Sequence, residues 1–304
     1  MNYVVVGGAG FVGSNLTDFL IKEGHQVTVV DNLSTGKESN VNEKAKLVVL
    51  DISHNSNLNK LIECFSGHDG LFHLAALARV QPSIDHPHKF NQANVNGTLH
   101  VLDAAKKAGI KRVVYSASSS AYGDAKIFPT PEEHPTDPIS PYGLQKLIGE
   151  QYCRVFYHCY DLETVSLRYF NVFGERQSID GAYKLVMGTF ADQRLKGKPL
   201  TITGDGEQRR DFTYVGDVVK ANLLAMNSTK VGAGESINIG NGDNRSVNQI
   251  ANLIGGPKNY IEKRLEPQQT LADNTKAKEL LGWKPTVSVE DWMPKYKKSL
   301  GILD

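Results

Sequence analysis

A glycine-rich turn near the start of the chain restricts the possible folds more than any other stretch. Residues 3–6 (Tyr-Val-Val-Val) form a short apolar run that is typical of a buried parallel strand. The run continues directly into Gly7-Gly-Ala-Gly-Phe-Val-Gly13, and a helical pattern follows over residues 14–23. Glycines at positions 7, 10 and 13 allow a tight turn, close packing of the helix on the strand, and approach of backbone N–H groups to a pyrophosphate. The stretch therefore predicts a dinucleotide-binding unit.

An aspartate at the end of the next expected strand supports that interpretation. The strand covers residues 26–30, and Asp31 follows Gly13 by 18 positions. This is close to the spacing at which a carboxylate meets the ribose hydroxyls of an adenosine. Since a carboxylate would repel a 2′-phosphate, NAD is favoured over NADP as the cofactor. The alternative is a glycine-rich turn followed by an unrelated surface aspartate.

Strand and helix patterns then alternate along the chain. Further strands are expected at residues 46–52, 70–76, 112–118 and 163–170, and helices at 58–65, 89–107 and 141–160. Such alternation predicts an α/β fold: a Rossmann-type, doubly wound parallel sheet with helices on both faces and ligands at the carboxyl ends of the strands. Asp51 and Ile52, at the end of the third strand, are placed to meet an adenine edge.

After Asn171 the pattern becomes less regular and indicates a second, smaller unit. Helices are expected at residues 182–195, 246–253, 275–281 and 289–300, and short strands at 200–203 and 260–265. Segments 211–215 and 236–239 are expected to be strands that return to the first sheet. We therefore expect an NAD-binding domain at residues 1–170, with a returning segment at about 211–243. A discontinuous C-terminal α/β substrate domain would cover 171–304, mainly 171–210 and 244–304.

The helix expected at residues 141–160 carries a pair of side chains with catalytic potential. Tyr142 and Lys146 are four residues apart, about one helical turn, so they project from the same face. A free tyrosine has a pKa near 10, and an adjacent ammonium favours the phenolate. The pair therefore predicts a tyrosine whose pKa is moved toward the range of a general base.

Composition excludes several classes of function. The net charge of +1 over 304 residues suggests neither nucleic acid nor an anionic membrane as a partner. Three cysteines without zinc or redox spacing, no apolar run long enough to span a bilayer, and a first strand that starts at Asn2 predict a cytoplasmic protein. His86 and His88 have no cysteine or carboxylate cluster near them, so no metal site is expected. Glu132 and Glu133 lie in a proline-rich loop and are expected to be solvated.

Taken together, the motifs resemble the extended short-chain dehydrogenase/reductase family, and within it the UDP-hexose 4-epimerases. The resemblance covers nearly the whole chain. Besides the glycine turn, it rests on Asp31-Asn-Leu-Ser-Thr-Gly36, His73-Leu-Ala-Ala76, Asn94-Val-Asn-Gly-Thr98, Ser116-Ala-Ser-Ser-Ser-Ala-Tyr-Gly123, Leu167-Arg-Tyr-Phe-Asn-Val-Phe-Gly174, Gly204-Asp-Gly-Glu-Gln-Arg-Arg-Asp211 and Leu281-Gly-Trp-Lys-Pro285.

The resemblance implies a catalytic trio of Ser118, Tyr142 and Lys146. Ser118 would lie beside the 4-hydroxyl of the sugar, Tyr142 would act as acid and base, and Lys146 would hold the nicotinamide ribose. The reaction would pass through a transient 4-keto sugar, with a tightly bound NAD that is regenerated in each turnover. A hydroxyl in a serine-rich strand end can also simply cap a neighbouring helix, which is the alternative for Ser118.

Binding residues follow from the same resemblance. Cofactor contacts are expected from Gly7, Gly10, Phe11, Val12, Asp31, Asn32, Ser34, Thr35, Gly36, Asp51, Ile52, Leu74, Ala75, Ala76, Asn94, Tyr142, Lys146 and Tyr169.

For the UDP-sugar substrate, the resemblance points to Ser118, Tyr142, Asn171, Arg210, Arg264 and Thr270. Arg210 suits the diphosphate because a guanidinium can engage phosphate oxygens bidentately; an ordinary ion pair with Asp211 is the alternative. Either Lys263 or Arg264 would supply a further basic group, since the usual Arg-Pro-Gly is absent. Thr270 stands where epimerases restricted to plain hexoses look bulky, which favours acceptance of UDP-GlcNAc and UDP-GalNAc alongside UDP-Glc and UDP-Gal. The segment Arg79-Val-Gln-Pro-Ser83 is an unusual version of the loop over the sugar.

Several other functions compete with epimerisation. Sugar-nucleotide 4,6-dehydratases carry an Asp-Glu pair where this chain has Ser119-Ser120, and glucuronate epimerases would carry a threonine near Asn171-Val172. A UDP-glucuronate decarboxylase and a non-catalytic NAD-sensing module are further alternatives. Similar proteins form homodimers through helices that correspond to residues 89–107 and 141–160, so a homodimer is expected.

Overall fold

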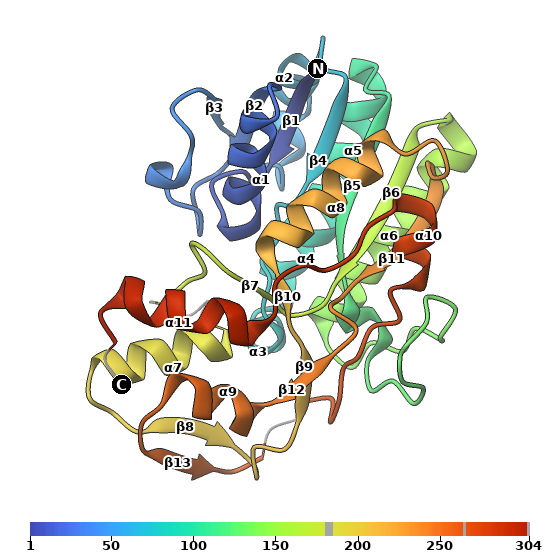
Figure 1. Cartoon of the computed structure of the whole chain (residues 1–304). Coiled ribbons are helices and arrows are strands. Elements are labelled where there is room, and N and C mark those ends of the chain that lie inside the picture. The colour runs from blue at the N-terminus through green and yellow to red at the C-terminus, as the bar shows by residue number, and fades with distance from the viewer. Residues whose placement is uncertain (180–184, 264–265, 303–304) are drawn as a thin grey trace.

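The central sheet of the protein contains seven parallel strands. The computed structural model describes residues 1–179, 185–263 and 266–302 (Figure 1). In spatial order the strands are β11 (Ala233–Ile239), β6 (Glu163–Tyr169), β5 (Arg112–Ser118), β4 (Gly70–His73), β1 (Asn2–Val6), β2 (Gln26–Asp31) and β3 (Lys46–Val49). The order reverses between β1 and β4, and parallel sheets bind ligands at such a reversal. The α/β, Rossmann-type prediction is confirmed.

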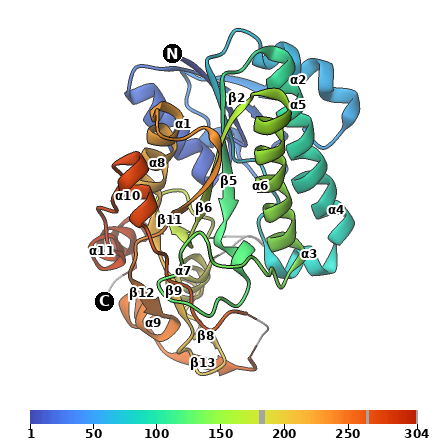
Figure 2. The ribbon, with the colours of Figure 1, turned by 90° about the vertical axis from the view of Figure 1, so that its right-hand side faces the viewer.

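Helices cover both faces of this sheet, as Figure 2 shows. One face packs against α1 (Phe11–Lys22), α8 (Val215–Asn227) and α10 (Thr275–Leu281), and the other against α2 (Leu58–Phe65), α5 (Gly97–Ala108) and α6 (Pro141–Tyr160). Strand β1 explains the two layers, because Tyr3 and Val5 enter the first core and Val4 and Val6 the second.

A second lobe lies below the carboxyl ends of the strands in Figure 1. Its core joins α7 (Val186–Leu195), α9 (Val247–Ile254) and α11 (Val289–Leu300) with the parallel strands β8 (Leu200–Thr203) and β13 (Lys258–Ile261). Ser246 and Gln249 form the capping box that starts α9. The shorter elements are α3 (Val80–Asp85), α4 (Pro87–Asn91), β7 (Val172–Phe173), β9 (Arg209–Asp211), β10 (Thr213–Tyr214) and β12 (Asn244–Ser246).

The expectation that residues 211–215 return to the main sheet is wrong. Strand β11 already occupies the sheet edge beside β6, so this segment finds other partners. Strand β9 pairs with β12, β10 pairs with β7, and Val215 begins the unpredicted helix α8. The side chains divide accordingly: Phe212 packs in the core of the second lobe and Val215 in the core of the first.

Two further elements differ from the sequence prediction in their extent. The helix expected at residues 89–107 is interrupted by a π-helical turn, Gln92–Asn96, before α5 begins at Gly97. The strands expected at residues 46–52 and 70–76 end at Val49 and His73. The residues that follow these strands leave the sheet as loops.

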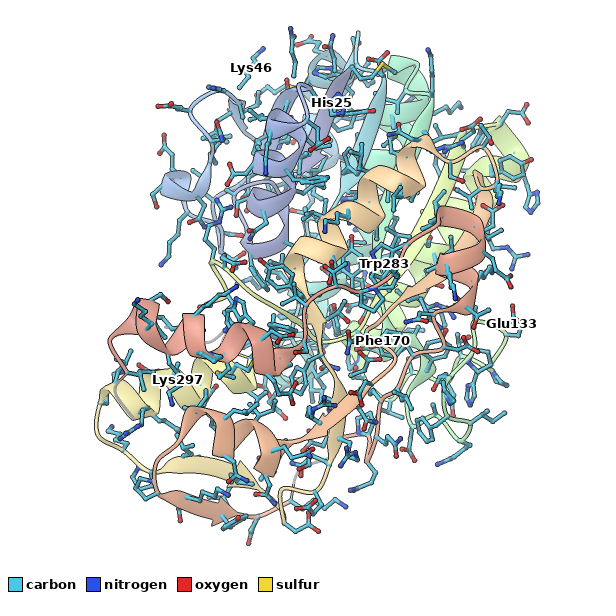
Figure 3. The ribbon with its side chains drawn as sticks, viewed as in Figure 1. His25, Lys46, Glu133, Phe170, Trp283 and Lys297 are labelled. Atoms are coloured by element: carbon cyan, nitrogen blue, oxygen red, sulfur yellow. The ribbon has the colours of Figure 1, made fainter. Side chains whose placement is uncertain are left out.

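The predicted helix at residues 275–281 is confirmed as α10, but it packs on the first lobe. It contacts α8 and β11, and Ala277 and Leu281 join the core under α8. The chain continues through Trp283, labelled in Figure 3, whose indole Nε1 donates a hydrogen bond to the Asp217 backbone oxygen at 2.8 Å. Residues 275–283 therefore lie on the first lobe, inside the range that the sequence assigned to the substrate domain.

Among the described residues, none of the helices is long and apolar enough to cross a membrane. Within the same residues, no group of three or more His, Cys, Asp or Glu side chains is arranged to hold a metal ion.

A buried ion pair joins α6 to β6 and to the loop that contains Glu132. The Arg168 guanidinium donates to both carboxylate oxygens of Glu150, with the closest contact at 2.8 Å, and the two side chains are 6% and 1% exposed. Arg168 also donates to the Glu132 backbone oxygen. The expectation of a solvated Glu132 is wrong, because its carboxylate accepts the Asn238 N–H at 2.8 Å and burial raises its pKa. Glu133, labelled in Figure 3, is exposed as expected.

We expect Glu150→Gln to lower the free energy of unfolding by about 3 kcal/mol, because it leaves the buried Arg168 charge uncompensated. Glu163→Gln is the matched control: Glu163 pairs with Arg112, but its side chain is 48% exposed, so its loss should cost less than about 1 kcal/mol. Denaturant unfolding followed by circular dichroism measures both. Equal costs for the two variants would contradict the importance of the buried pair.

Candidate active site

A cleft of about 900 Å³ runs along the carboxyl ends of the central strands. Most of the residues predicted to bind a cofactor line it, and so does the whole predicted catalytic trio. These are Gly7, Gly10, Phe11, Val12, Asp31, Asn32, Ser34, Thr35, Asp51, Ile52, Leu74, Ala75, Ala76, Ser118, Tyr142, Lys146 and Tyr169. These residues lie far apart in the sequence, and the parallel sheet brings them together because they follow the carboxyl ends of its strands.

The glycine turn is packed so tightly that two of its positions exclude a side chain. Gly7 has φ +87°, and a Cβ there would lie 2.5 Å from the Ala75 nitrogen. A Cβ on Gly13 would lie 2.1 Å from the Gly7 carbonyl oxygen. Gly10, which precedes the first turn of α1, has an ordinary φ of −79° and more room, with its nearest neighbour at 3.4 Å. The backbone N–H groups at the start of α1 are therefore accessible to an anion from the cleft.

Two carboxylates that line this cleft are held in fixed orientations. Asp31 accepts the backbone N–H of Ala9 at 3.0 Å and that of Leu33 at 2.8 Å. Asp51 accepts the Asn32 side-chain amide at 2.9 Å. Burial opposes ionisation of Asp51, but hydrogen bonds from Ser53 and Asn32 outweigh it, and its pKa is lowered. A helix start that can bind an anion, together with oriented carboxylates in the same cleft, fits a dinucleotide with free ribose hydroxyls.

Gly36 and Asn94, also predicted to contact the cofactor, do not line the cleft. A Cβ on Gly36 would lie 2.8 Å from the Ala9 carbonyl carbon, so this glycine packs behind the turn. Asn94 is 1% exposed, exchanges hydrogen bonds with the backbone of Leu77 at 2.8 and 3.0 Å, and donates to Gln145. Asn94 therefore fixes the position of the loop after β4 through hydrogen bonds to its backbone.

The three residues of the predicted catalytic trio come from the end of β5 and the first turns of α6. Helix α6 starts at Pro141, as predicted, and the Ser140 side chain caps its first turn. Lys146 is 3% exposed, and its Nζ donates to the Ser116 backbone oxygen at 2.7 Å. Burial lowers the pKa of Lys146 to about 8, against the charge of Glu150.

Ser118 fits both interpretations of its hydroxyl. The Oγ accepts the backbone N–H of Ser120 at 3.2 Å and so caps the short 3₁₀ turn that follows β5. The same hydroxyl donates to the Ser120 Oγ at 3.1 Å, and its hydrogen bond with Tyr142 lowers the pKa of that tyrosine. Capping and a place in the cleft are compatible here.

The electrostatic environment of Tyr142 differs from the sequence prediction. Burial raises the pKa of Tyr142, and the hydrogen bond with Ser118 and the positive charge of Arg79 act against it. The sequence predicted a lowered value with Lys146 as the cause. That expectation is wrong for this structure, because burial outweighs the opposing interactions and the Lys146 ammonium is directed to the Ser116 backbone oxygen.

A second cavity of about 350 Å³ adjoins the cleft, and Asn171 lines both. Arg210 lines this second cavity, and its Nη2 lies 2.7 Å from the Glu266 carboxylate. The alternative of an ion pair with Asp211 is wrong: the Asp211 carboxylate accepts backbone N–H groups of Asn241, Gly242 and Ala272. Burial raises the pKa of Asp211 to about 6 against these hydrogen bonds.

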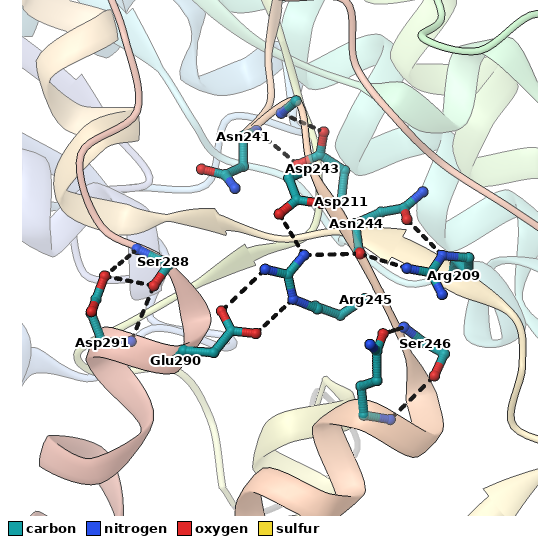
Figure 4. Close-up of polar contacts among 12 residues, drawn as sticks. Arg209, Asp211, Asn241, Asp243, Asn244, Arg245, Ser246, Ser288, Glu290 and Asp291 are labelled. Carbon is teal, nitrogen blue, oxygen red and sulfur yellow. Dashed lines mark hydrogen bonds and ion pairs between the residues drawn. The ribbon is translucent and has the colours of Figure 1, made fainter.

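The other substrate predictions have different outcomes. Thr270 lines neither cavity; its Oγ1 accepts the Asn171 side-chain amide at 3.3 Å and the Asp211 N–H at 3.1 Å. Arg264 lies outside the residues that the structure describes. Figure 4 shows the polar contacts that fix this region, including the hydrogen bonds from the Arg209 side chain to Asn244.

Sequence reasoning missed several residues of the cleft wall, among them Arg79, Arg176 and Gln177. Arg176 and Gln177 lie two and three residues after the motif that ends at Gly174, so continuing the motif by a few residues would have found them. Arg79 was noticed only as part of an unusual loop, because no local pattern shows which way that loop faces.

Comparisons with known proteins agree with this geometry. The sequence model of the NAD-dependent epimerase/dehydratase family matches residues 3–240. The chain is 39% identical over 295 residues to a putative UDP-glucose 4-epimerase of Methanocaldococcus jannaschii, covering 95% of this chain and 94% of that protein.

Two solved structures extend the similarity to the whole fold. A UDP-glucose 4-epimerase from Thermotoga maritima, solved with UDP-glucose, has a TM-score of 0.92 and 40% identity over 99% of this chain and 100% of that one. A UDP-N-acetylglucosamine 4-epimerase from Methanobrevibacter ruminantium, in complex with UDP-N-acetylmuramic acid, has a TM-score of 0.90 and 35% identity over 99% of this chain and 97% of that one.

The packing of the glycine turn predicts opposite effects for two substitutions. Gly10→Ala should leave the melting temperature nearly unchanged, because the added methyl has room, yet weaken NAD binding by roughly tenfold, equivalent to about 1.4 kcal/mol, by crowding the helix start. Gly13→Ala should lower the melting temperature as well, because its methyl overlaps the Gly7 carbonyl. Calorimetric titration with NAD and thermal melts measure both effects. Undiminished NAD binding by Gly10→Ala would place the cofactor elsewhere.

Proposed function

The chain belongs to the NAD-dependent epimerase/dehydratase family, and we propose that it interconverts UDP-hexoses that differ at C4. One observation carries the proposal: Ser118, Tyr142 and Lys146 line the same cleft as the glycine turn and Asp31. The adjoining cavity has in its wall the side-chain amide of Asn171 and the guanidinium of Arg210, which is paired with Glu266, and both can donate hydrogen bonds to a diphosphate. Acid–base side chains thus lie between a dinucleotide site and a nucleotide-sugar site.

The proposed roles follow from the chemistry of each side chain. Tyr142 takes the proton of the 4-hydroxyl and later returns it, and Ser118 hydrogen-bonds the same sugar oxygen. Lys146, held by Ser116, carries the charge that binds the nicotinamide ribose. When bound, NAD supplies reversible acceptance of a hydride from C4, so the sugar passes through a 4-keto form without net redox change.

The cleft wall also bears on the competing functions. Ser119 and Ser120 occupy the wall directly after Ser118, where a 4,6-dehydratase would carry its Asp-Glu pair. A serine hydroxyl is a far weaker acid than a carboxyl group. These two serines therefore do not provide the acid–base pair that a dehydratase uses to eliminate water. Val172 lines the cleft beside Asn171. Glucuronate epimerases are expected to carry a threonine here, so the valine argues against that activity.

We propose that N-acetylated UDP-hexoses are accepted beside plain ones, as the small side chain of Thr270 suggests. The hydroxyl of Thr270 bonds Asn171, so a larger residue at position 270 would disturb a side chain shared by both cavities. An effect on the sugar would therefore be transmitted through Asn171.

Supplying UDP-Glc, UDP-Gal, UDP-GlcNAc and UDP-GalNAc separately, without added NAD, tests the function directly. We expect NMR to show conversion of at least one sugar into its C4 epimer with no net NADH. Tyr142→Phe should lower the rate by about 10²–10⁴ while NAD content is retained, because only the transferable proton is lost. If all four sugars stay unchanged even with NAD supplied, epimerisation of these sugars is refuted, and the dehydratase, uronate and sensor alternatives should be tested.

We further propose that the protein forms a homodimer through the outer face of α6. Leu144, Ile148 and Val155 lie at helical spacing on this face, and Leu144 and Val155 are each 48% exposed. Apolar side chains repeated along one helix face favour association with another apolar surface. The same helix carries Tyr142, so the dimer would stabilise the element on which the chemistry depends.

Light scattering coupled to size exclusion tests this interface. We expect a dimer for the wild type and a monomer for Val155→Glu, because a charge would be buried against its partner. Leu195→Glu is the matched control: Leu195 is 47% exposed at the end of α7 in the other lobe. A monomeric wild type, or a dimeric Val155→Glu, would contradict the proposed interface.

A further inference from the structure

The chain that leaves β7 passes between α1 of the first lobe and α11 of the second (Figure 1). Glu175, in this connection, is hydrogen-bonded to both helices. Its backbone oxygen accepts the side-chain amide of Asn15, in α1, at 2.9 Å. Its carboxylate accepts the indole N–H of Trp292, in α11, at 3.0 Å, and the hydroxyl of Tyr214, directly before α8, at 2.9 Å. A single residue is thus bonded to elements of both lobes.

On the side of the second lobe, the Glu175 carboxylate is bonded to a well-packed group of aromatic side chains. Glu175 itself is exposed, but Trp292 is only 4% exposed. The indole of Trp292 stacks on Tyr296 with ring centroids 4.2 Å apart and meets Phe173 edge to face at 5.2 Å. Since these rings belong to the core of the second lobe, the hydrogen bond from Trp292 fixes Glu175 to that core.

On the side of the first lobe, the contacts reach the helix that starts at the glycine turn. Asn15 lies in the second turn of α1. Arg176, the residue after Glu175, pairs with Asp18 of the same helix at 2.5 Å and donates to the Asn40 backbone oxygen at 3.3 Å. The Asn40 side chain in turn donates to the Ala9 backbone oxygen at 3.0 Å. The connection is therefore bonded to both segments that surround the glycine turn.

The backbone of the connection adopts an unfavourable conformation between these contacts. Arg176 has φ +64°, in the left-handed region that residues with a Cβ rarely adopt. Such a conformation persists only where the surrounding contacts determine it. Here the ion pair with Asp18 and the hydrogen bonds of Glu175 supply those contacts. The path of the chain is thus set by both lobes and not by local preference.

The two cavities meet at this connection. Asn171 and Val172, before Glu175, and Gln177, after it, each line both the cleft and the second cavity. The position of one cavity relative to the other consequently depends on how this short stretch is held. Reactions between two bound molecules are sensitive to such placement, because a shift of about 1 Å can slow them by about 10².

We propose that Glu175 is a positioning residue that fastens the second lobe to α1 and so sets the position of the second cavity relative to the cleft. The consequence for catalysis, a sugar held at the correct distance from the cofactor, rests on the function proposed above. The fastening itself does not, because it concerns contacts within this chain only.

Hydrogen–deuterium exchange of the protein without ligands tests the fastening. We expect Glu175→Ala to speed amide exchange in α1 as well as in α11, because one change removes bonds on which both helices depend. Glu175→Gln should resemble the wild type, since its amide oxygen can accept the Trp292 N–H and its amide nitrogen can donate to the Tyr214 hydroxyl. Faster exchange in α11 with no change in α1 would contradict the fastening.

Kinetics and binding test the consequence for the reaction. We expect Glu175→Ala to lower kcat by about tenfold, because the sugar is misplaced against the cofactor. Calorimetric titration with UDP and with NAD should give Kd values within about twofold of the wild type, since each site keeps its own residues. Glu175→Gln should restore most of kcat. A loss of general stability alone would not separate kcat from binding in this way.

Glu290→Ala is the matched control, because Glu290 lies on α11 like Trp292 but bonds Arg245, within the second lobe. We expect it to leave both kcat and exchange in α1 unchanged, and thermal melts establish that each variant is folded. An unchanged kcat in Glu175→Ala, or an equal loss in Glu290→Ala, would overturn the positioning role. If the exchange result holds but the wild type epimerises no UDP-hexose, the proposed function is refuted and the fastening stands.

Discussion

The close approach of α1 to the turn after β1 fixes the geometry on which the cleft depends. A side chain at Gly13 would lie 2.1 Å from the Gly7 carbonyl, and one at Gly7 would lie 2.5 Å from the backbone of Ala75. Three chain segments can therefore meet only as bare backbone. This contact directs the start of α1 toward the cleft. It also fixes the position of the loop after β4, which lines the same cleft.

The parallel sheet then gathers the chemistry at one edge. Strand β5 ends at Ser118, its neighbour β6 ends at Tyr169, and the two residues are paired in register. Helix α6 connects β5 to β6 along the chain, and its first turns bring Tyr142 and Lys146 to the same wall of the cleft. On the other side, Asn171 follows β6 and reaches the second lobe through hydrogen bonds to the Asp211 backbone and to Thr270. The proposed cofactor, acid–base and nucleotide-sugar sites thus follow one another along one edge of the sheet.

Local signals in the sequence were enough to predict most of this architecture. The glycine turn, Asp31 and the Tyr142–Lys146 spacing each depend on residues close together in the chain, and each occupies the expected place. Contacts distant in sequence were not predictable in the same way. The pairing of residues 211–215 depends on β11 filling the sheet edge, and Asn94 binds a loop instead of facing the cleft. The pKa of Tyr142 depends on burial, on the hydrogen bond with Ser118 and on the charge of Arg79.

A label at C4 of the sugar tests the central claim most directly. A UDP-hexose with deuterium at C4 is incubated with the purified protein in ordinary water, and the products are analysed by NMR. We expect both epimers to keep the deuterium at C4 with no net NADH, since the same hydrogen leaves as hydride and returns to the other face while Tyr142 handles only the hydroxyl proton. Loss of the C4 deuterium to water, with epimerisation proceeding, would contradict the proposed mechanism.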